Sequence, residues 1–266
     1  MSLSKTGFIH DVEDNRDFTI CRQDSKVPRG LTPGSELPQS VDLESRFTPV
    51  ENQGSLGSCT AQAVVGVAEY MTNLSKKTYT DLSRLFLYKV TRNLMGKTGD
   101  TGASIRACMH ALRTLGTCPE GFYPYNIEDF DEEPPILAYA LAQNYKAVTY
   151  YRLGDTGDDL VQAVKELISQ GTPVVCGVKV FTGYFKDSGN VYYPDDLSST
   201  SSGWHAIILM GYDEAKKMFK FRNSWGTDWG KNGYGWLSYD YIKNTATSAD
   251  FWALNNINFI DINDIL

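Results

Sequence analysis

The stretch Gln53-Gly54-Ser55-Leu56-Gly57-Ser58-Cys59-Thr60-Ala61 carries a glycine-rich loop into a hydrophobic segment. In that segment, apolar residues recur at helical spacing over a run too long for a strand: Ala61, Val64, Val65, Ala68 and Met71. The pattern predicts a buried helix that begins at or beside Cys59. A helix N-terminus stabilises an anion through its dipole and its unpaired N–H groups, so we expect a lowered thiol pKa and a nucleophilic thiolate. Read alone, Cys59 could also be a small, buried and inert side chain.

Helical patterns dominate the first half of the chain, and strand patterns dominate the second. Two more helices are predicted in the first half of the chain. One covers Ser83–Leu94. The other ends before Gly116, and its apolar face consists of Ile105, Cys108, Met109 and Leu112. Later segments rich in β-branched and aromatic residues predict strands at Tyr145–Leu153, Val174–Val180, His205–Tyr212, Met218–Arg222, Gly235–Tyr239 and Phe251–Asn258. A single helix, about Asp158–Gln170, is expected to interrupt them. The prediction is an α+β fold with a helical lobe, a β lobe and a ligand cleft between the two.

Composition narrows the functional classes. The chain has 266 residues, 42% of them hydrophobic, and a net charge of −7, so a sizeable core is possible. Its acidic runs indicate a solvated surface or a preference for basic substrates, and nucleic acid is excluded because phosphate binding needs clustered Lys and Arg. No stretch approaches the roughly 18 apolar residues of a membrane helix. No CxxC or HxxxH spacing suggests zinc, so no metal is expected.

The five cysteines also indicate in which cellular compartment the protein folds. Their number is odd and their spacing is not repeated, so they do not indicate a disulfide framework. A cytoplasmic location is therefore favoured, and secretion is not excluded.

The segment Gly203–Tyr212 places a histidine, His205, at the head of a long apolar strand. There the ring can stay oriented while one ring nitrogen faces a thiolate, although a satisfied core histidine is the competing interpretation. The other two histidines, His10 and His110, lie outside any chemical pattern and are interpreted as structural or surface residues.

These blocks resemble the papain and cathepsin family of cysteine peptidases. The loop before Cys59 is similar to the C-G-[SA]-C-[WY] signature of that family, and Gln53 stands six residues before the cysteine, as the family requires. The block Arg222-Asn223-Ser224-Trp225-Gly226-Thr227-Asp228-Trp229-Gly230-Lys231-Asn232-Gly233-Tyr234 resembles the asparagine block of the family almost residue for residue. The resemblance covers about residues 37 to 258.

The resemblance implies a papain-like fold with a β-barrel-like, antiparallel C-terminal lobe and a cysteine peptidase mechanism. Cys59 would be the nucleophile, His205 its proton partner and Asn223 the group that orients the histidine. Gln53 and the Cys59 N–H would hold the oxyanion. The residues expected beside the substrate or shielding the catalytic hydrogen bond are Gly57, Gly102, Trp204 and Trp225. No cofactor is implied.

Three departures from the family pattern affect the expectations. Leu56 replaces a disulfide cysteine, which agrees with a reducing compartment, and Thr60 replaces a tryptophan beside the nucleophile. We therefore expect a prokaryotic-type member without the long helical propeptide of secreted relatives. We expect an endopeptidase acting on peptides or proteins. An acyl transferase such as a peptide ligase, a deamidase and a catalytically silent peptide-binding module remain alternatives.

Residues 1–36 are polar, rich in proline and glycine, and predicted to form an extended arm. Residues 37–266 form the expected peptidase domain, mainly helical over about 50–122 and mainly β over about 123–266. We expect a monomer whose arm lies across the cleft and restrains activity, with a plain docking arm as the alternative.

Overall fold

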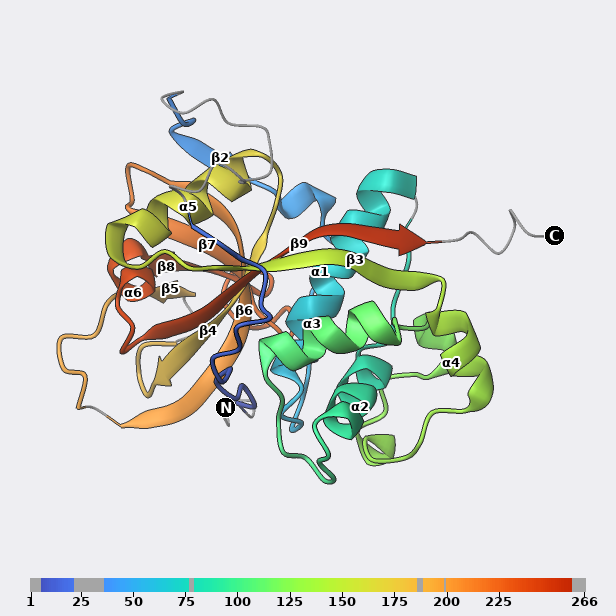
Figure 1. Ribbon diagram of the computed structural model, residues 1–266. Coiled ribbons are helices and arrows are strands. Elements are labelled where there is room, and N and C mark those ends of the chain that lie inside the picture. Colours follow the sequence, from blue (N-terminus) through green and yellow to red (C-terminus); the bar gives the residue numbers. More distant parts are fainter. Residues whose placement is uncertain (1–5, 22–35, 77–78, 186–188, 199, 260–266) are drawn as a thin grey trace.

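The helices that follow the first segment of the chain pack together on one side of the molecule (Figure 1). The computed structural model describes residues 6–21, 36–76, 79–185, 189–198 and 200–259. The four helices on this side are α1 (Cys59–Lys76), α2 (Arg84–Leu94), α3 (Ile105–Thr114) and α4 (Ile136–Ala142). Short 3-10 turns lie at Glu44–Arg46, Glu120–Phe122 and Ile127–Asp129.

A nine-stranded sheet forms the other side, and its strands β3 (Tyr145–Leu153) and β9 (Ser248–Phe259) reach over the helices (Figure 1). Its main path runs β1 (Thr19–Ile20), β3, β9, β4 (Val174–Phe181), β6 (Ser201–Asp213), β7 (Met218–Arg222), β8 (Tyr234–Ser238) and β5 (Asn190–Val191). A further strand, β2 (Ser40–Asp42), pairs with β6. All pairs are antiparallel except β1 with β3 and β5 with β8. The other two helices are α5 (Gly157–Ser169) and α6 (Tyr239–Lys243).

Helix α1 is the centre of the core. It contacts α2 and α3 on one side and β6 on the other. Its valines and alanines at 64, 65, 67 and 68 are completely buried, as expected of a helix that is apolar all round. The neighbouring helices begin at serine caps, where Ser83 accepts from the Phe86 N–H and Ser104 accepts from the Ala107 N–H. The site therefore rests on a rigid central element.

Most predicted elements are confirmed, including the α+β fold class, the start of α1 at Cys59 and the bounds of β3 and β7. The expectation of a single helix in the second half is wrong, because α4 and α6 are also present. The strand predicted over Gly235–Tyr239 ends one residue earlier, since Tyr239 begins α6. Helix α4 packs on the helical side, where the Tyr139 ring meets the Phe86 ring edge-on.

Buried arginines connect the loop before α1 to the two sides of the molecule. Arg222, at the end of β7, donates to the carbonyls of Thr48 and Pro49. Arg84 of α2 pairs with the fully buried Glu69 of α1, with the charged atoms 2.7 Å apart. Breaking the Arg84–Glu69 pair would leave a charge buried without its partner, a cost of several kcal/mol (~3–5). The Arg222 contacts fix the loop that carries Gln53 relative to the strand end that carries Asn223.

Among the described residues, none of the helices combines the length and apolar character needed to cross a membrane.

Candidate active site

Cys59 is the first residue of α1, and its side chain is completely buried. Backbone N–H groups of Gly7, Thr60 and Ala206 contact its sulfur and favour the thiolate. Burial nevertheless dominates and raises the pKa of the thiol to about 11. The expectation of a lowered pKa is therefore wrong for this covered arrangement, because removal of water outweighs the helix N-terminus.

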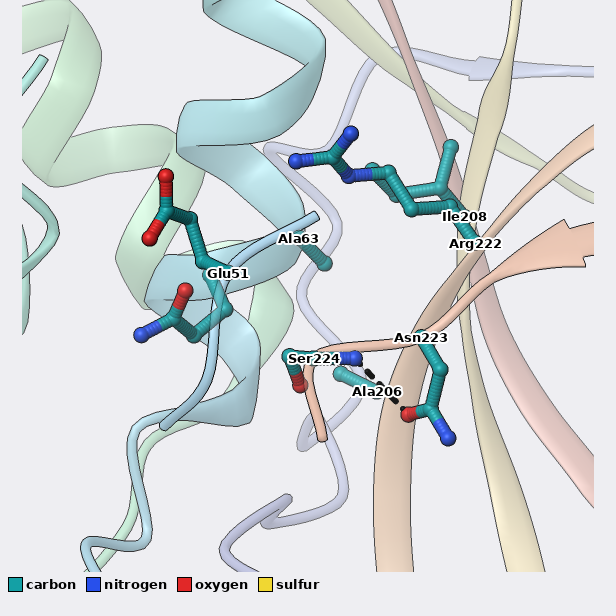
Figure 2. A pocket seen from close by; sticks show the side chains of 8 residues that line it. Glu51, Ala63, Ala206, Ile208, Arg222, Asn223 and Ser224 are labelled. Atoms are coloured by element: carbon teal, nitrogen blue, oxygen red, sulfur yellow. Dashed lines mark hydrogen bonds between the residues drawn. The ribbon is translucent and has the colours of Figure 1, made fainter. Parts of the chain in front are cut away.

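The side chains of His205 and Asn223 form a buried hydrogen bond, with Nε2 and Oδ1 2.8 Å apart. The same Oδ1 accepts from the Ser224 N–H at 2.8 Å, and Figure 2 shows this contact beside a small cavity. A backbone N–H can only donate, so the amide atom between the two groups is the oxygen. Nε2 must then carry the proton. In the neutral ring, Nδ1 is the proton acceptor, and it has no hydrogen-bond partner among the described residues.

Two features set the state of the His205 ring. Burial lowers its pKa to about 4, against a smaller opposing contribution from the hydrogen bond to Asn223. The ring of Trp225 stacks on the imidazole at 4.7 Å between centroids and 30° between planes. This places Trp225 where the sequence predicted a shield for the hydrogen bond. Both Cys59 and His205 are thus neutral in this arrangement.

Gln53 lies in the loop before α1, and its side chain is completely buried. Its Oε1 accepts from the Ser224 hydroxyl at 2.6 Å, and its Nε2 donates to the Leu56 carbonyl at 2.8 Å. Its backbone N–H donates to the Ser224 carbonyl. An amide NH₂ carries two hydrogens, of which the Leu56 carbonyl takes one. Gln53 and Asn223 are therefore joined through one residue, Ser224.

The N-terminal segment passes between the helices and the sheet (Figure 1), and the Gly7 N–H of this segment favours the Cys59 thiolate. Gly7 lies between Gly57 and Gly102, which the sequence predicted as cleft residues. A Cβ atom at Gly7 would stand 2.0 Å from the Gly57 carbonyl oxygen, and one at Gly102 would stand 2.1 Å from the Gly7 oxygen. The contact therefore requires glycine at these positions. The Gly7 carbonyl also accepts from the Ala103 N–H at 3.0 Å.

Phe8 is the next residue of this segment, and it is 7% exposed. Its ring packs against Gly177 of β4, where a Cβ atom would stand 2.5 Å from the ring. Its N–H donates to the Trp204 carbonyl at 3.2 Å, so the predicted cleft residue Trp204 contacts the arm through its backbone. The Trp204 ring meets His10 edge-on at 4.2 Å between centroids. His10 is therefore a cleft contact, which its sequence surroundings did not indicate.

Asp11 anchors the segment at its far end. Its carboxylate accepts from the Trp252 Nε1–H at 2.7 Å and from the Arg106 N–H at 3.1 Å, at the start of α3. Its N–H donates to Asp250 at 2.8 Å. Burial, together with the negative charge of Asp250, raises the Asp11 pKa. A few residues on, Asp17 pairs with the Arg106 guanidinium.

The structure brings all eight sequence-predicted site residues to one region, which they share with the arm. Sequence reasoning missed Gly7, Phe8 and Asp11 because the segment holding them shows no local pattern. Across the described ranges, no group of three or more metal-binding side chains is present. The predicted arm residues 1–5 and 22–35 lie outside the described residues.

Known proteins match most of the chain. The model of the papain family cysteine protease matches residues 37–251. An uncharacterized peptidase C1-like protein of Acanthamoeba polyphaga mimivirus is 30% identical, over 97% of this chain and 91% of its own length. A cysteine protease of Blomia tropicalis is 33% identical, over 88% and 72%. The structure of xylellain, a cysteine protease from Xylella fastidiosa, aligns over 95% of this chain and 96% of its own with a TM-score of 0.81 and 33% identity. The chain therefore belongs to the papain family of cysteine proteases and is a hydrolase.

Proposed function

We propose that this cysteine peptidase cleaves internal peptide bonds through Cys59, His205 and Asn223, and that its N-terminal arm holds it latent. The observation that carries the proposal is the His205 ring. Asn223 fixes its Nε2 as the protonated nitrogen, which leaves Nδ1 as the acceptor, and the N–H of the next residue, Ala206, favours the Cys59 thiolate.

Each chemical step follows from these positions. The thiol proton passes to Nδ1, and the Cys59 sulfur attacks the peptide carbonyl, forming a carbon–sulfur bond. The oxyanion is held by the Cys59 N–H and the Gln53 amide. Imidazolium then protonates the leaving amine as the carbon–nitrogen bond breaks. His205 next takes a proton from water, the resulting hydroxide displaces the sulfur, and the acid product leaves.

Latency rests on what the arm presents to the sulfur. The arm brings the Gly7 N–H to the Cys59 thiol, and its backbone fills the space between Gly57 and Gly102. It also completes the burial that raises the Cys59 pKa and lowers that of His205. Release of the arm would rehydrate both groups and favour the ion pair.

The test uses peptides blocked at both ends and two forms of the full chain, the wild type and Gly7→Ala, whose added Cβ atom would stand 2.0 Å from the Gly57 carbonyl oxygen and displace the arm. In the arm-opened form, we expect cleavage at internal bonds, together with an acyl adduct on Cys59 that mass spectrometry detects after rapid acid quenching. Cys59→Ala is the matched control and should abolish both. Cleavage only at free peptide ends would overturn the endopeptidase assignment.

An added amine distinguishes hydrolysis from acyl transfer. If the acyl group passes mainly to the amine at millimolar concentrations, the enzyme is a transferase with the same nucleophile. If peptides bind to the arm-opened Gly7→Ala form but give neither adduct nor product, the protein is a silent binding module and the proposal fails.

A further inference from the structure

A tyrosine hydroxyl closes the loop that carries the oxyanion donors. Tyr125 lies in the loop between the 3-10 turns Glu120–Phe122 and Ile127–Asp129. Its OH donates to the Gln53 carbonyl at 3.0 Å and lies 2.6 Å from the Ser58 Oγ. A phenol has one proton, and the Gln53 carbonyl takes it, so Ser58 must donate to Tyr125. The hydrogen bonds therefore run in one direction from Ser58 through Tyr125 to Gln53.

The two ends of this chain of hydrogen bonds are the two sides of the oxyanion site. Gln53 supplies the side-chain donor of the proposed mechanism, and Ser58 directly precedes Cys59, whose N–H is the other donor. Both residues are completely buried. Burial raises the pKa of Tyr125 to about 12, so its hydroxyl stays protonated. The loop between the two donors is thus bridged by one hydroxyl that comes from a distant part of the chain.

The Tyr125 segment is itself held in place. The Tyr125 N–H donates to the Glu120 carboxylate. Two residues further on, Ile127 packs on Gly54 of the same loop, where a Cβ atom would stand 2.6 Å from the Ile127 Cδ1. Gly54 has a φ of +60°, so it also needs the freedom of glycine at this contact.

We infer that Tyr125 is a positioning residue, which sets the distance between the Gln53 amide and the Cys59 N–H and so tunes oxyanion stabilisation. It touches neither the substrate nor the reacting atoms. The inference rests on the proposed function of this site. Removing one oxyanion donor in comparable enzymes costs about 10²–10³ in kcat, so a donor that is loosened but kept should cost less, roughly 10- to 100-fold.

The test compares Tyr125→Phe with Tyr123→Phe in the full chain. Tyr123 is a matched control, since its hydroxyl also has two hydrogen-bond contacts, here with the Asp129 and Glu132 carbonyls, which share its one proton away from the oxyanion loop. Three quantities are measured: turnover of a blocked peptide, affinity for a peptide aldehyde, and the rate of Cys59 alkylation by iodoacetamide. The aldehyde adduct has an oxyanion, whereas alkylation forms none and reports access to the thiolate.

For Tyr125→Phe, we expect peptide turnover to fall 10- to 100-fold through a lower kcat, with a parallel loss of affinity for the aldehyde. The alkylation rate should stay within twofold of wild type. Tyr123→Phe should lower the melting temperature to a similar extent and leave turnover unchanged. Wild-type turnover in Tyr125→Phe, an equal loss in Tyr123→Phe, or a parallel fall in alkylation would each overturn the inference.

Ser58→Ala breaks the same set of hydrogen bonds at its other end and keeps the test decisive if Tyr125→Phe does not fold. We expect a smaller fall in turnover and, in the double variant, no further loss beyond that of Tyr125→Phe. Full turnover in Ser58→Ala would contradict the inference. If neither the wild-type chain nor arm-opened Gly7→Ala cleaves the peptide or binds the aldehyde, the proposed function fails and the inference fails with it. An active parent chain with an unaffected Tyr125→Phe variant contradicts the inference alone.

Discussion

Substituting Gly7 by alanine should open the cleft without touching the catalytic groups. The new Cβ would stand 2.0 Å from the Gly57 carbonyl oxygen and 2.3 Å from its carbon, and backbone cannot yield by that much locally. The arm must therefore give up its three neighbouring backbone hydrogen bonds, Phe8 to Trp204 and the two with Ala103. At about 1 kcal/mol net for each bond, the docked state loses ~3 kcal/mol. That loss raises the fraction of molecules whose arm has left the cleft about 100-fold.

The assay is alkylation of the full chain by iodoacetamide, with peptide mapping to separate Cys59 from the other cysteines. Val12→Ala is the control within the arm, since the Val12 side chain is 80% exposed and its removal should leave the rate unchanged. We expect Cys59 in Gly7→Ala to react about 100 times faster, and peptide turnover to rise with it. An unchanged alkylation rate in a folded Gly7→Ala protein would refute the reasoning, because the arm would then not limit access.

Three further predictions follow from particular side chains. Asn223→Ala should lower kcat about tenfold with little change in KM, because the His205 ring loses a hydrogen bond of about 1–1.5 kcal/mol. Steady-state kinetics on an arm-opened variant would measure this effect, and an unchanged kcat would contradict the orienting role of Asn223. Phe8→Ala should accelerate Cys59 alkylation about 30-fold, since burial of that ring contributes ~2 kcal/mol to docking; a rate equal to wild type would argue against the Phe8 contact. Burial raises the pKa of Glu120 to about 7, so between pH 4.5 and 7 the folded chain holds a proton that the unfolded chain has lost, and the free energy of unfolding falls as pH rises. Glu120→Gln should abolish roughly 1–2 kcal/mol of that decline in denaturant unfolding, after allowance for the partial exposure of the side chain. An identical pH profile in the variant would count against the raised pKa.

The candidate site could be predicted where chemistry requires particular residues at short spacing. Cys59 stands at the head of a long apolar run, and that run can only be a buried helix. Asn223 directly follows the end of β7, and His205 has a distinctive local sequence. The prediction that His205 heads its strand is wrong, because β6 begins four residues earlier, at Ser201. These blocks can be recognised from the sequence because their function depends on neighbours a few positions away in the chain.

Other parts of the site depend on contacts that sequence spacing does not encode. Tyr125 acts through residues far from it in the chain, and its own surroundings resemble an ordinary loop. Gly7 fits only because Gly57 and Gly102 meet it from two different segments. The lowered pKa expected for Cys59 followed from its helix position alone, whereas its burial depends on the arm. Helix α4 was missed because seven residues give too little periodicity to separate a helix from a loop.

In the proposed latent state, the arm is a ligand tethered to its own receptor, and the tether determines how the arm would compete with substrate. A short tether supplies a local concentration on the order of millimolar, which does not depend on how much enzyme is present. Dilution therefore cannot activate the chain, and a separate peptide with the sequence of residues 6–17 would have to reach millimolar levels to inhibit equally well. A substrate displaces the arm only if the ratio of its concentration to its dissociation constant exceeds the same ratio for the tethered arm. Weak substrates are thus excluded by competition before any catalytic step can distinguish them.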